Sequence, residues 1–185
     1  VDCGTDGEGI GKADGFTVFV KDAVIGDTVA AKIMKAKKNY GYGRLMEILN
    51  PSPYRVEPVC PSARQCGGCQ LQAVSYEEQK VFKEKKLRGH LERIGGFHDL
   101  PMEPLIGMDE PYHYRNKAQF PVGRNKEGRI ITGFYAGRTH AIIENRDCAL
   151  GIPQNKEVLD RVIAHMEKYN IAPYDEMTGK GLVRH

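Results

Sequence analysis

The sequence predicts a mixed α+β protein in which a small β-barrel precedes a cysteine loop, a helix and a central antiparallel-sheet α/β domain. Short apolar segments recur at roughly ten-residue spacing near the N-terminus, which is typical of a small barrel. Cysteines crowd into residues 60–69 after a proline-rich stretch, and two later segments carry helical periodicity. The predicted limits are 1–52 for the barrel, 53–72 for the linker and cysteine loop, and 73–185 for the central domain, incomplete at its C-terminal end.

Composition and chain ends restrict the class of protein. Hydrophobic residues make up 41% and charged residues 28% of the 185 positions, which is typical of a soluble globular chain. No apolar run reaches the roughly eighteen residues of a membrane span, and no signal-peptide pattern is present. We therefore expect no membrane partner and a cytoplasmic location. The chain begins at Val1 and stops without a closing helix or turn, so we interpret it as a piece of a longer protein.

The barrel prediction depends on three apolar segments with turn signals between them. GFTVFV (15–20) alternates, TVAAKIM (28–34) is largely apolar, and RLMEIL (44–49) adds a further strand. The tripeptides ADG and IGD mark turns near these segments. A small barrel with a basic, tyrosine-bearing hairpin resembles the OB-type plan for RNA binding.

A basic stretch with interleaved tyrosines falls on that hairpin. It contains no acidic residue, and its members are Lys32, Lys35, Lys37, Lys38, Tyr40, Tyr42 and Arg44. Cations can follow a phosphate backbone while aromatic rings stack on bases. A second stretch, residues 80–93, is also rich in Lys and Arg. Either stretch alone is equally compatible with a solvated charged face, but together they favour a nucleic acid as partner.

A helix is predicted to begin after Ser75. Ser75 and Glu78 fit a capping box, and Gly95 with Gly96 supplies a stop signal. The apolar residues expected to share one face of this helix are Tyr76, Leu87, Leu91 and Ile94. A second amphipathic helix is predicted from about Gln154, with a stripe made of Val158, Val162, Met166 and Tyr169.

The central domain is predicted to contain strands between residues 112 and 148. YHYRNKAQFPV (112–122) has a period of two, so Arg115, Lys117 and Gln119 should lie on one exposed face. These three are candidates for contact with the nucleic acid, and a solvated strand face is an equally good interpretation. RIITGFYA and THAIIEN follow as partner strands.

The cysteine pattern predicts a metal site. Cys60, Cys66 and Cys69 form C-x5-C-x2-C, and Cys148 follows far along the chain. Three ligands in one loop with one remote ligand favour an iron–sulfur cluster, whereas zinc sites usually show two short pairs. Spacing alone leaves zinc, a redox dithiol and ordinary structural cysteines open. Cys3 is left over as a structural or incidental thiol.

The glycine-rich N-terminal segment VDCGTDGEGIG superficially resembles a cofactor-binding loop. Such a loop follows a buried parallel strand and opens onto a helix, whereas here a strand segment follows the glycines. We therefore expect the glycines to shape a turn between two barrel strands.

The same residues resemble a known family. GEGIGKADGFTVFVKDAVIGDTV resembles a TRAM domain, and PVCPSARQCGGCQLQAVSYEEQKVFKEKKL resembles the iron–sulfur loop and helix of RumA/TrmA-type RNA (uracil-5-)methyltransferases. YRNKAQFPVG, ITGFYAGRTHAI and DCALGIP resemble the central domain of that family, so the likeness covers essentially the whole chain. The resemblance implies that a 4Fe-4S cluster is bound by Cys60, Cys66, Cys69 and Cys148.

The resemblance also implies a function. In the family, a methyl group passes from S-adenosylmethionine to C5 of a uridine after a cysteine thiolate adds to C6, and these groups lie in a C-terminal domain. No catalytic residue is therefore expected in this chain, which would be the inactive RNA-recognition half of the enzyme, with ribosomal RNA as partner and no DNA. The cofactors would be the cluster here and S-adenosylmethionine in the missing domain. A stand-alone RNA-binding module and an iron–sulfur electron-transfer protein are the alternatives.

Overall fold

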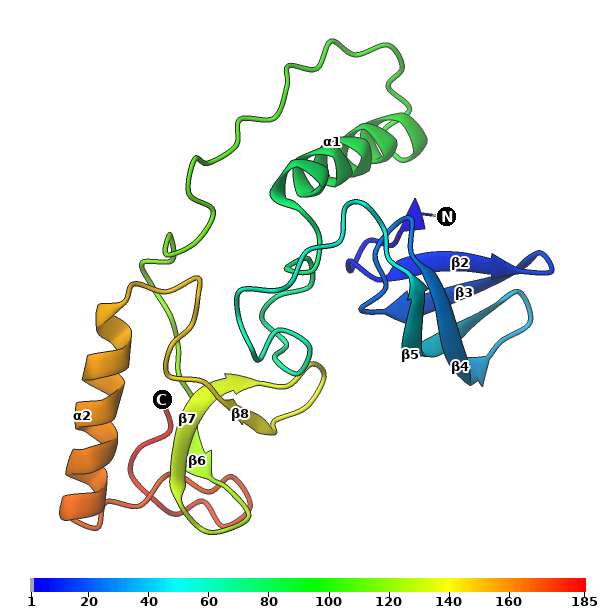
Figure 1. Ribbon diagram of the computed structural model, residues 1–185. Coiled ribbons are helices and arrows are strands. Elements are labelled where there is room, and N and C mark those ends of the chain that lie inside the picture. The colour runs from blue at the N-terminus through cyan, green and yellow to red at the C-terminus, as the bar shows by residue number, and fades with distance from the viewer. Residues whose placement is uncertain (1) are drawn as a thin grey trace. The chain divides into compact units, whose positions relative to one another are not determined.

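The computed structural model describes residues 2–185 and shows the predicted mixed α+β composition (Figure 1). Its elements are β1 (Asp2–Cys3), β2 (Gly9–Ala13), β3 (Phe16–Lys21), β4 (Thr28–Ala36), β5 (Tyr40–Asn50), α1 (Tyr76–Arg93), β6 (Val122–Arg124), β7 (Ile130–Tyr135), β8 (Ile142–Glu144) and α2 (Gln154–Lys168). Two compact units form. Unit 1 joins Val1–Pro58 to Gln70–Met108, and unit 2 joins Val59–Cys69 to Asp109–His185. The helix thus groups with the barrel, and the cysteine loop groups with the central sheet. The three predicted domain limits stay a prediction.

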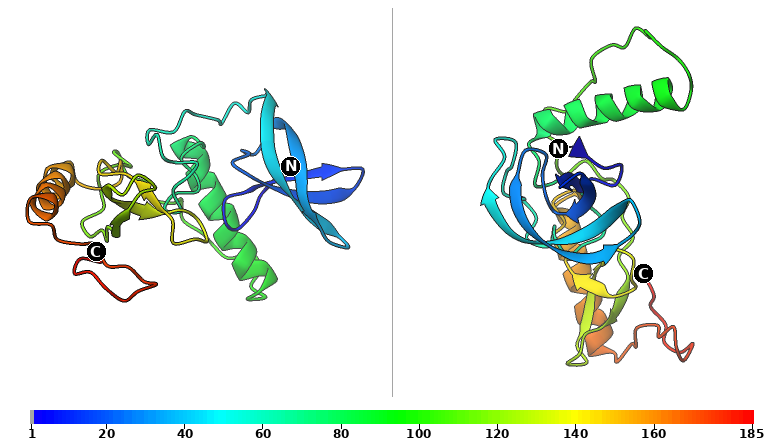
Figure 2. Two further views of the ribbon diagram at one scale, coloured as in Figure 1. Left: turned by 90° about the horizontal axis from the view of Figure 1, so that it is seen from below. Right: turned by 90° about the vertical axis from the view of Figure 1, so that its right-hand side faces the viewer.

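Unit 1 contains a five-stranded sheet in the order β1-β2-β3-β5-β4, whose strands curl around one another (Figure 2, right). The pair β3–β5 is parallel, and the other pairs are antiparallel. Its core contains Val18, Val20 and Ala23, with partly buried side chains such as Leu45 packed against them. The predicted strand segments are therefore confirmed, and so is the turn that the N-terminal glycines form between β1 and β2.

The hairpin between β2 and β3 shows why its turn residues were informative. Asp14 has φ +48° and Gly15 has φ +81°, so both central residues lie in the left-handed region. A two-residue turn of this kind matches the twist of the flanking strands, and Asp-Gly is one of the few pairs that adopt it easily. The turn sets the register Ala13↔Phe16, which places alternate residues of β3 in the core.

The helix α1 begins where the sequence predicts. The Ser75 hydroxyl accepts a hydrogen bond from the Glu78 amide at 3.4 Å, and Gly96 with φ +69° follows the helix end. The predicted apolar face is correct only in part, however: Tyr76 and Leu91 are half-buried, but Leu87 is 53% and Ile94 81% exposed. The side of α1 that lies over the barrel end is basic instead, so tertiary packing overrides the apolar pattern.

Unit 2 is built on the antiparallel sheet β6-β7-β8, against which α2 packs. Val122 and Ile130 of the sheet meet Ile163 and Met166 of the helix in one buried cluster. The predicted stripe of α2 is correct for Met166 alone. Val158, Val162 and Tyr169 are exposed, so the buried side of the helix is rotated from the one expected.

The predicted strand at residues 112–122 is largely absent. Only Val122 enters a strand, while Arg115 forms an isolated bridge with Gly151. Tyr114, which alternates with Arg115 and so should lie on the opposite, inward face, is exposed. A period of two cannot by itself make a strand, because the backbone also needs a neighbouring chain to pair with. Within residues 2–185, no helix is long and apolar enough to cross a membrane.

Candidate nucleic-acid interface and cysteine cluster

The outer face of the barrel gathers three aromatic rings. β3 and β5 pair so that Phe19 lies beside Tyr42 and Thr17 beside Tyr40. Because side chains alternate along a strand, the inward position of Val18 puts these neighbours on the opposite, outer face. The parallel pairing therefore brings together rings that are more than twenty positions apart in the sequence.

The three rings form one cluster. Ring centroids are 5.7 Å apart for Phe19–Tyr40, 5.8 Å for Phe19–Tyr42 and 5.7 Å for Tyr40–Tyr42. Lys37 Nζ lies 5.4 Å from the centroid of Tyr40, and its hydrogen bond and charge lower the pKa of the Tyr40 hydroxyl. The rings line a shallow pocket of about 400 Å³. We name this cluster the aromatic platform: Phe19, Tyr40 and Tyr42.

Cations surround the aromatic platform. Lys35 lies opposite Tyr42, and Lys32 lies opposite Arg44, in the β4–β5 pairing. Lys38 is exposed in the turn between these two strands. The structure therefore brings the predicted basic and tyrosine residues of the hairpin to one region. A positive rim around stackable rings is the arrangement that single-stranded nucleic acids favour.

The sequence interpretation missed part of this face. Phe19 completes the aromatic platform, and Lys21 joins its rim through its pairing with Arg44. The alternation of GFTVFV contained a signal, because Phe19 falls out of phase with the buried Val18 and Val20. An aromatic residue at an outward strand position could have been marked as a candidate for stacking.

The other predicted contact residues are not assembled in the same way. Arg115, Lys117 and Gln119 belong to unit 2 and lie on an irregular segment rather than a strand face. Arg115 is half-buried, and its amide donates to the carbonyl of Leu150 at 2.8 Å. Lys117 and Gln119 are exposed. The face on which the three were expected to lie together is absent.

All four cysteines of the predicted cluster fall in unit 2. Cys60 and Cys66 are buried, and Cys69 and Cys148 are half-buried. Local turns shape the loop, since the amide of Cys66 donates to the carbonyl of Ser62 at 2.8 Å. No disulfide joins cysteines among the described residues 2–185.

The two glycines of this loop allow close approach. The Gly67 amide donates to the carbonyl of Tyr135 at 2.9 Å, which attaches the loop to β7. A Cβ at Gly67 would lie 3.0 Å from the backbone of Gly137, and one at Gly68 would lie 3.4 Å from Cys66 Sγ. Glycine at the first position thus fits a close approach to the backbone of residues 135–137, and glycine at the second leaves space beside sulfur.

Amide donors already point at two of the sulfurs. The Gly68 amide donates to Cys66 Sγ at 3.3 Å, and Asn145 Nδ2 donates to Cys60 Sγ at 3.5 Å. Burial raises the pKa of the Cys66 thiol, and the nearby Cys60 and Cys148 raise it further. Three cysteines are therefore electrostatic neighbours. Among residues 2–185, however, no group of three or more His, Cys, Asp or Glu side chains has the geometry to hold a metal ion.

The comparisons with known proteins agree with the barrel. Residues 2–46 match the TRAM domain. A Clostridium tetani protein named as an uncharacterized RNA methyltransferase is 45% identical over 182 residues, which is 98% of this chain and 39% of the relative. A Bacillus cereus protein with the same name is 44% identical over 97% of this chain and 39% of its own length.

A solved structure supports the fold. The Pyrococcus abyssi tRNA (uracil-54, C5)-methyltransferase, in complex with S-adenosyl-L-homocysteine, matches with a TM-score of 0.67 at 24% identity. The match covers 99% of this chain and 39% of that one. The chain thus spans about two fifths of the length of the relatives it matches. By sequence and by its TRAM domain, the chain is similar to that part of these RNA methyltransferases.

Proposed function

We propose that this chain is the RNA-recognition part of an S-adenosylmethionine-dependent RNA (uracil-5-)methyltransferase acting on 23S ribosomal RNA in the cytoplasm. The observation that carries the proposal is the aromatic platform with its cationic rim on the TRAM barrel. The names of the relatives support methyl transfer to RNA. Ribosomal RNA is favoured because the resemblance combines a TRAM barrel with a cysteine loop.

The outer face of the barrel can hold RNA through two kinds of interaction, with phosphates and with bases. Cations such as Lys32 and Lys35 neutralise phosphates and release counterions, which contributes affinity without sequence preference. The rings of the aromatic platform offer stacking surfaces to unpaired bases, worth roughly 1–3 kcal/mol per base. Lys37 lies over the Tyr40 ring, so one residue pair offers both a cation for a phosphate and a ring for a base. Unpaired rather than duplex RNA is the favoured partner.

We further propose that the cysteines of unit 2 hold a 4Fe-4S cluster. The residues fit a cluster in donor type, because four cysteines lie in one unit and two of them are buried. Three of the four, Cys60, Cys66 and Cys148, are close enough to influence one another electrostatically. Cys60, Cys66, Cys69 and Cys148 would be the ligands. The cluster would supply a covalent link between loop segments rather than a reaction step. Gly68 and Asn145 would stabilise sulfur charge with their N–H groups, which is how outer groups commonly tune such ligands.

The test of RNA binding uses the full chain and a 23S ribosomal RNA fragment, with a transfer RNA as comparison. We expect binding with a steep salt dependence and a preference for the ribosomal fragment. The double variant Lys35→Ala/Arg44→Ala should weaken binding and reduce the salt slope by about one per lost phosphate contact. Its matched control is Lys126→Ala/Arg129→Ala, which removes two exposed cations from unit 2. Equal losses of RNA affinity in both variants would contradict the proposal that RNA binds to the barrel face.

Two further measurements test the remaining parts. Anaerobic purification should yield a brown protein with bound iron and sulfide, whereas zinc on elemental analysis would exclude the cluster. The chain by itself should transfer no methyl group from labelled S-adenosylmethionine to RNA. Turnover by these 185 residues would show that catalytic groups lie within the chain and would overturn their placement elsewhere.

A further inference from the structure

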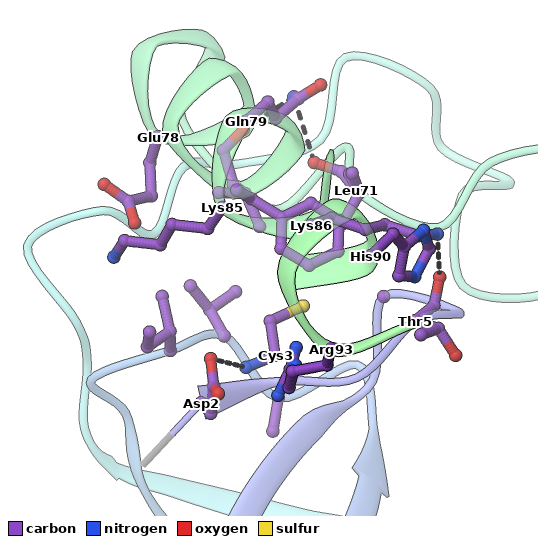
Figure 3. A pocket seen from close by; sticks show the side chains of 16 residues that line it. Asp2, Cys3, Thr5, Leu71, Glu78, Gln79, Lys85, Lys86, His90 and Arg93 are labelled. Atoms are coloured by element: carbon purple, nitrogen blue, oxygen red, sulfur yellow. Dashed lines mark hydrogen bonds between the residues drawn. The ribbon is translucent and has the colours of Figure 1, made fainter. Parts of the chain in front are cut away.

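Unit 1 contains a second cavity, which lies away from the aromatic platform. The helix α1 lies over the end of the barrel near β1 and encloses about 160 Å³ with it (Figure 3). Apolar side chains form a large part of its lining: Val24, Ile25, Leu71, Val74 and Phe82. Gln79 Nε2 donates to the carbonyls of Leu71 and Val74 at 3.1 and 2.9 Å, which fixes the first turns of α1 to one wall.

The α1 side of this cavity is strongly basic. Its cationic lining residues are Lys85, Lys86 and Arg93, and His90 lies on the same side (Figure 3). Lys86 Nζ donates to the carbonyl of Thr5 at 2.8 Å, and Arg93 Nε donates to a carbonyl of its own helix. None of the four forms an ion pair within residues 2–185. Two carboxylates, Asp2 and Glu78, also line the cavity, so the balance favours one negative group rather than several.

The volume limits what can enter. A protein cavity of about 150 Å³ lined by apolar side chains holds one benzene-sized ring. A cavity of about 160 Å³, partly open to solvent, therefore has room for one six-membered ring, and the second ring of a purine would lie outside it. Ligand pockets typically combine an apolar lining with a few polar groups that fix orientation. Here the polar groups are cations, which favour a phosphate attached to the ring.

We propose that this cavity binds one unstacked pyrimidine nucleotide, with its ring against the apolar wall and its phosphate between Lys85 and Arg93. The shared chemistry is a pyrimidine nucleoside monophosphate, either free or within a strand. RNA as the source rests on the proposed function of the barrel. A nucleotide held here would be an anchor in addition to the bases on the aromatic platform, and it would add a base preference that stacking alone does not provide.

The experiment compares oligouridine and oligocytidine with oligoadenosine of equal length, and UMP and CMP with AMP and GMP. The full chain should prefer the pyrimidine member of each set. Lys85→Ala/Arg93→Ala should remove this preference and reduce the salt slope for the oligonucleotide by about one. The matched control is Lys83→Ala/Arg88→Ala, which removes the same charge from exposed positions of α1 outside the cavity. Alanine favours helix, so both variants should keep α1.

Labelling of Cys3 gives a local readout, because its thiol lines the cavity. Bound UMP should slow iodoacetamide modification of Cys3, followed by peptide mass spectrometry, and AMP should not. Protection by UMP without protection by an oligopyrimidine would assign the cavity to a free nucleotide. Equal labelling with and without every pyrimidine ligand would overturn the inference. In that case unchanged binding of ribosomal RNA through the barrel face would leave the proposed function standing, whereas loss of all RNA binding would contradict that function separately.

Discussion

The aromatic platform and the cysteine loop are built by opposite means. The platform lies on strands whose register is set by continuous backbone pairing and whose other face packs a core of Val18, Val20 and Ala23. The loop, residues 59–69, contains no strand, and its link to the sheet of unit 2 includes one isolated bridge and the amide of Gly67. The first site is therefore fixed by the fold itself. Under the proposed function the second depends on the cluster proposed for its thiols, and perturbations should separate the two sites.

Removing a ligand of the proposed cluster should have the largest effect, and only in unit 2. Cys66→Ser should expose the Gly67 amide and increase hydrogen exchange there and in β7, because a bound metal group contributes directly to folding. Exchange in β3 should stay unchanged. Mass spectrometric hydrogen exchange resolves both segments. Cys3→Ser is the control, since Cys3 belongs to unit 1. Equal exchange in wild type and Cys66→Ser would mean that the loop needs no bound group.

The barrel has an equivalent weak point in a buried ion pair. Asp27, whose side chain is 1% exposed, accepts hydrogen bonds from Arg55 and from the amides of Val24 and Ser52. Arg55→Ala leaves that carboxylate buried without its cation and should cost about 3–5 kcal/mol of unfolding free energy. Urea denaturation of the barrel measures the loss. Arg161→Ala, which breaks the exposed pair with Glu157, should cost less than about 0.5 kcal/mol.

The same pair predicts the acid stability of unit 1. Burial alone would raise the pKa of Asp27, but the hydrogen bonds from Arg55, Ser52 and Val24 outweigh it and hold that pKa below its usual value. A lowered pKa contributes stability above the usual carboxyl range, and that stability is lost as the pH falls through the folded pKa. Arg55→Ala should therefore move acid unfolding of the barrel to higher pH, followed by circular dichroism. An unchanged midpoint would show that the pair contributes little.

The aromatic platform should matter for binding and little for folding. Tyr42→Ala should weaken binding of unpaired RNA by roughly 1–3 kcal/mol for the base it stacks, with little change in the salt slope. Tyr54→Ala is a matched control, because Tyr54 is 43% exposed against 40% for Tyr42 and lies outside the platform. Fluorescence anisotropy at two salt concentrations separates stacking from charge. A loss that disappears at high salt would assign the effect to phosphate contacts instead.

The sequence predicted those parts of the fold that local chemistry decides. The alternation of residues 15–20, the Asp14-Gly15 turn and the Ser75 cap each require only neighbours along the chain. The segment at 112–122 also alternates, yet the amides of His113 and Arg115 pair with the carbonyls of Ala149 and Leu150, which lie outside any strand. Pairing between distant segments decides whether such a segment becomes a strand, and one sequence does not contain that information in readable form.

Non-local packing also explains the errors at the sites. Phe19 joins the aromatic platform only because β3 pairs in parallel with β5, although β4 lies between these two strands in the sequence. The helix α1 turns its basic side to the cavity and leaves Ile94 exposed, against its apolar pattern. Cysteine spacing predicted the proximity of Cys60 and Cys66, since a short loop limits how far its thiols can separate. The pattern also pointed to Cys148, but its place beside Cys66 depends on how the loop packs in unit 2, which spacing does not show.

The smallest expected effect is a shift in the pKa of Cys3, a thiol that belongs to unit 1 and not to the cysteines of unit 2. Burial, followed by the charges of Glu8 and Asp2, raises the pKa of its thiol to about 11, while Lys86 acts in the opposite direction. Glu8→Gln should lower this pKa only part of the way, because burial remains, and Lys86→Met should raise it. The pH dependence of iodoacetamide labelling at Cys3 measures both.

The signs of the two shifts test whether the electrostatics of unit 1 are local. A raised thiol pKa means that the neutral form is preferred in the fold, so the stability it contributes is complete below the ordinary thiol pKa and is lost as the pH rises toward about 11. Glu8→Gln should reduce this alkaline loss slightly. Shifts of the same sign in Glu8→Gln and Lys86→Met would mean that a change in burial, rather than charge, dominates. Opposite signs would show that Cys3 senses its own cavity, independently of any group held by the cysteines of unit 2.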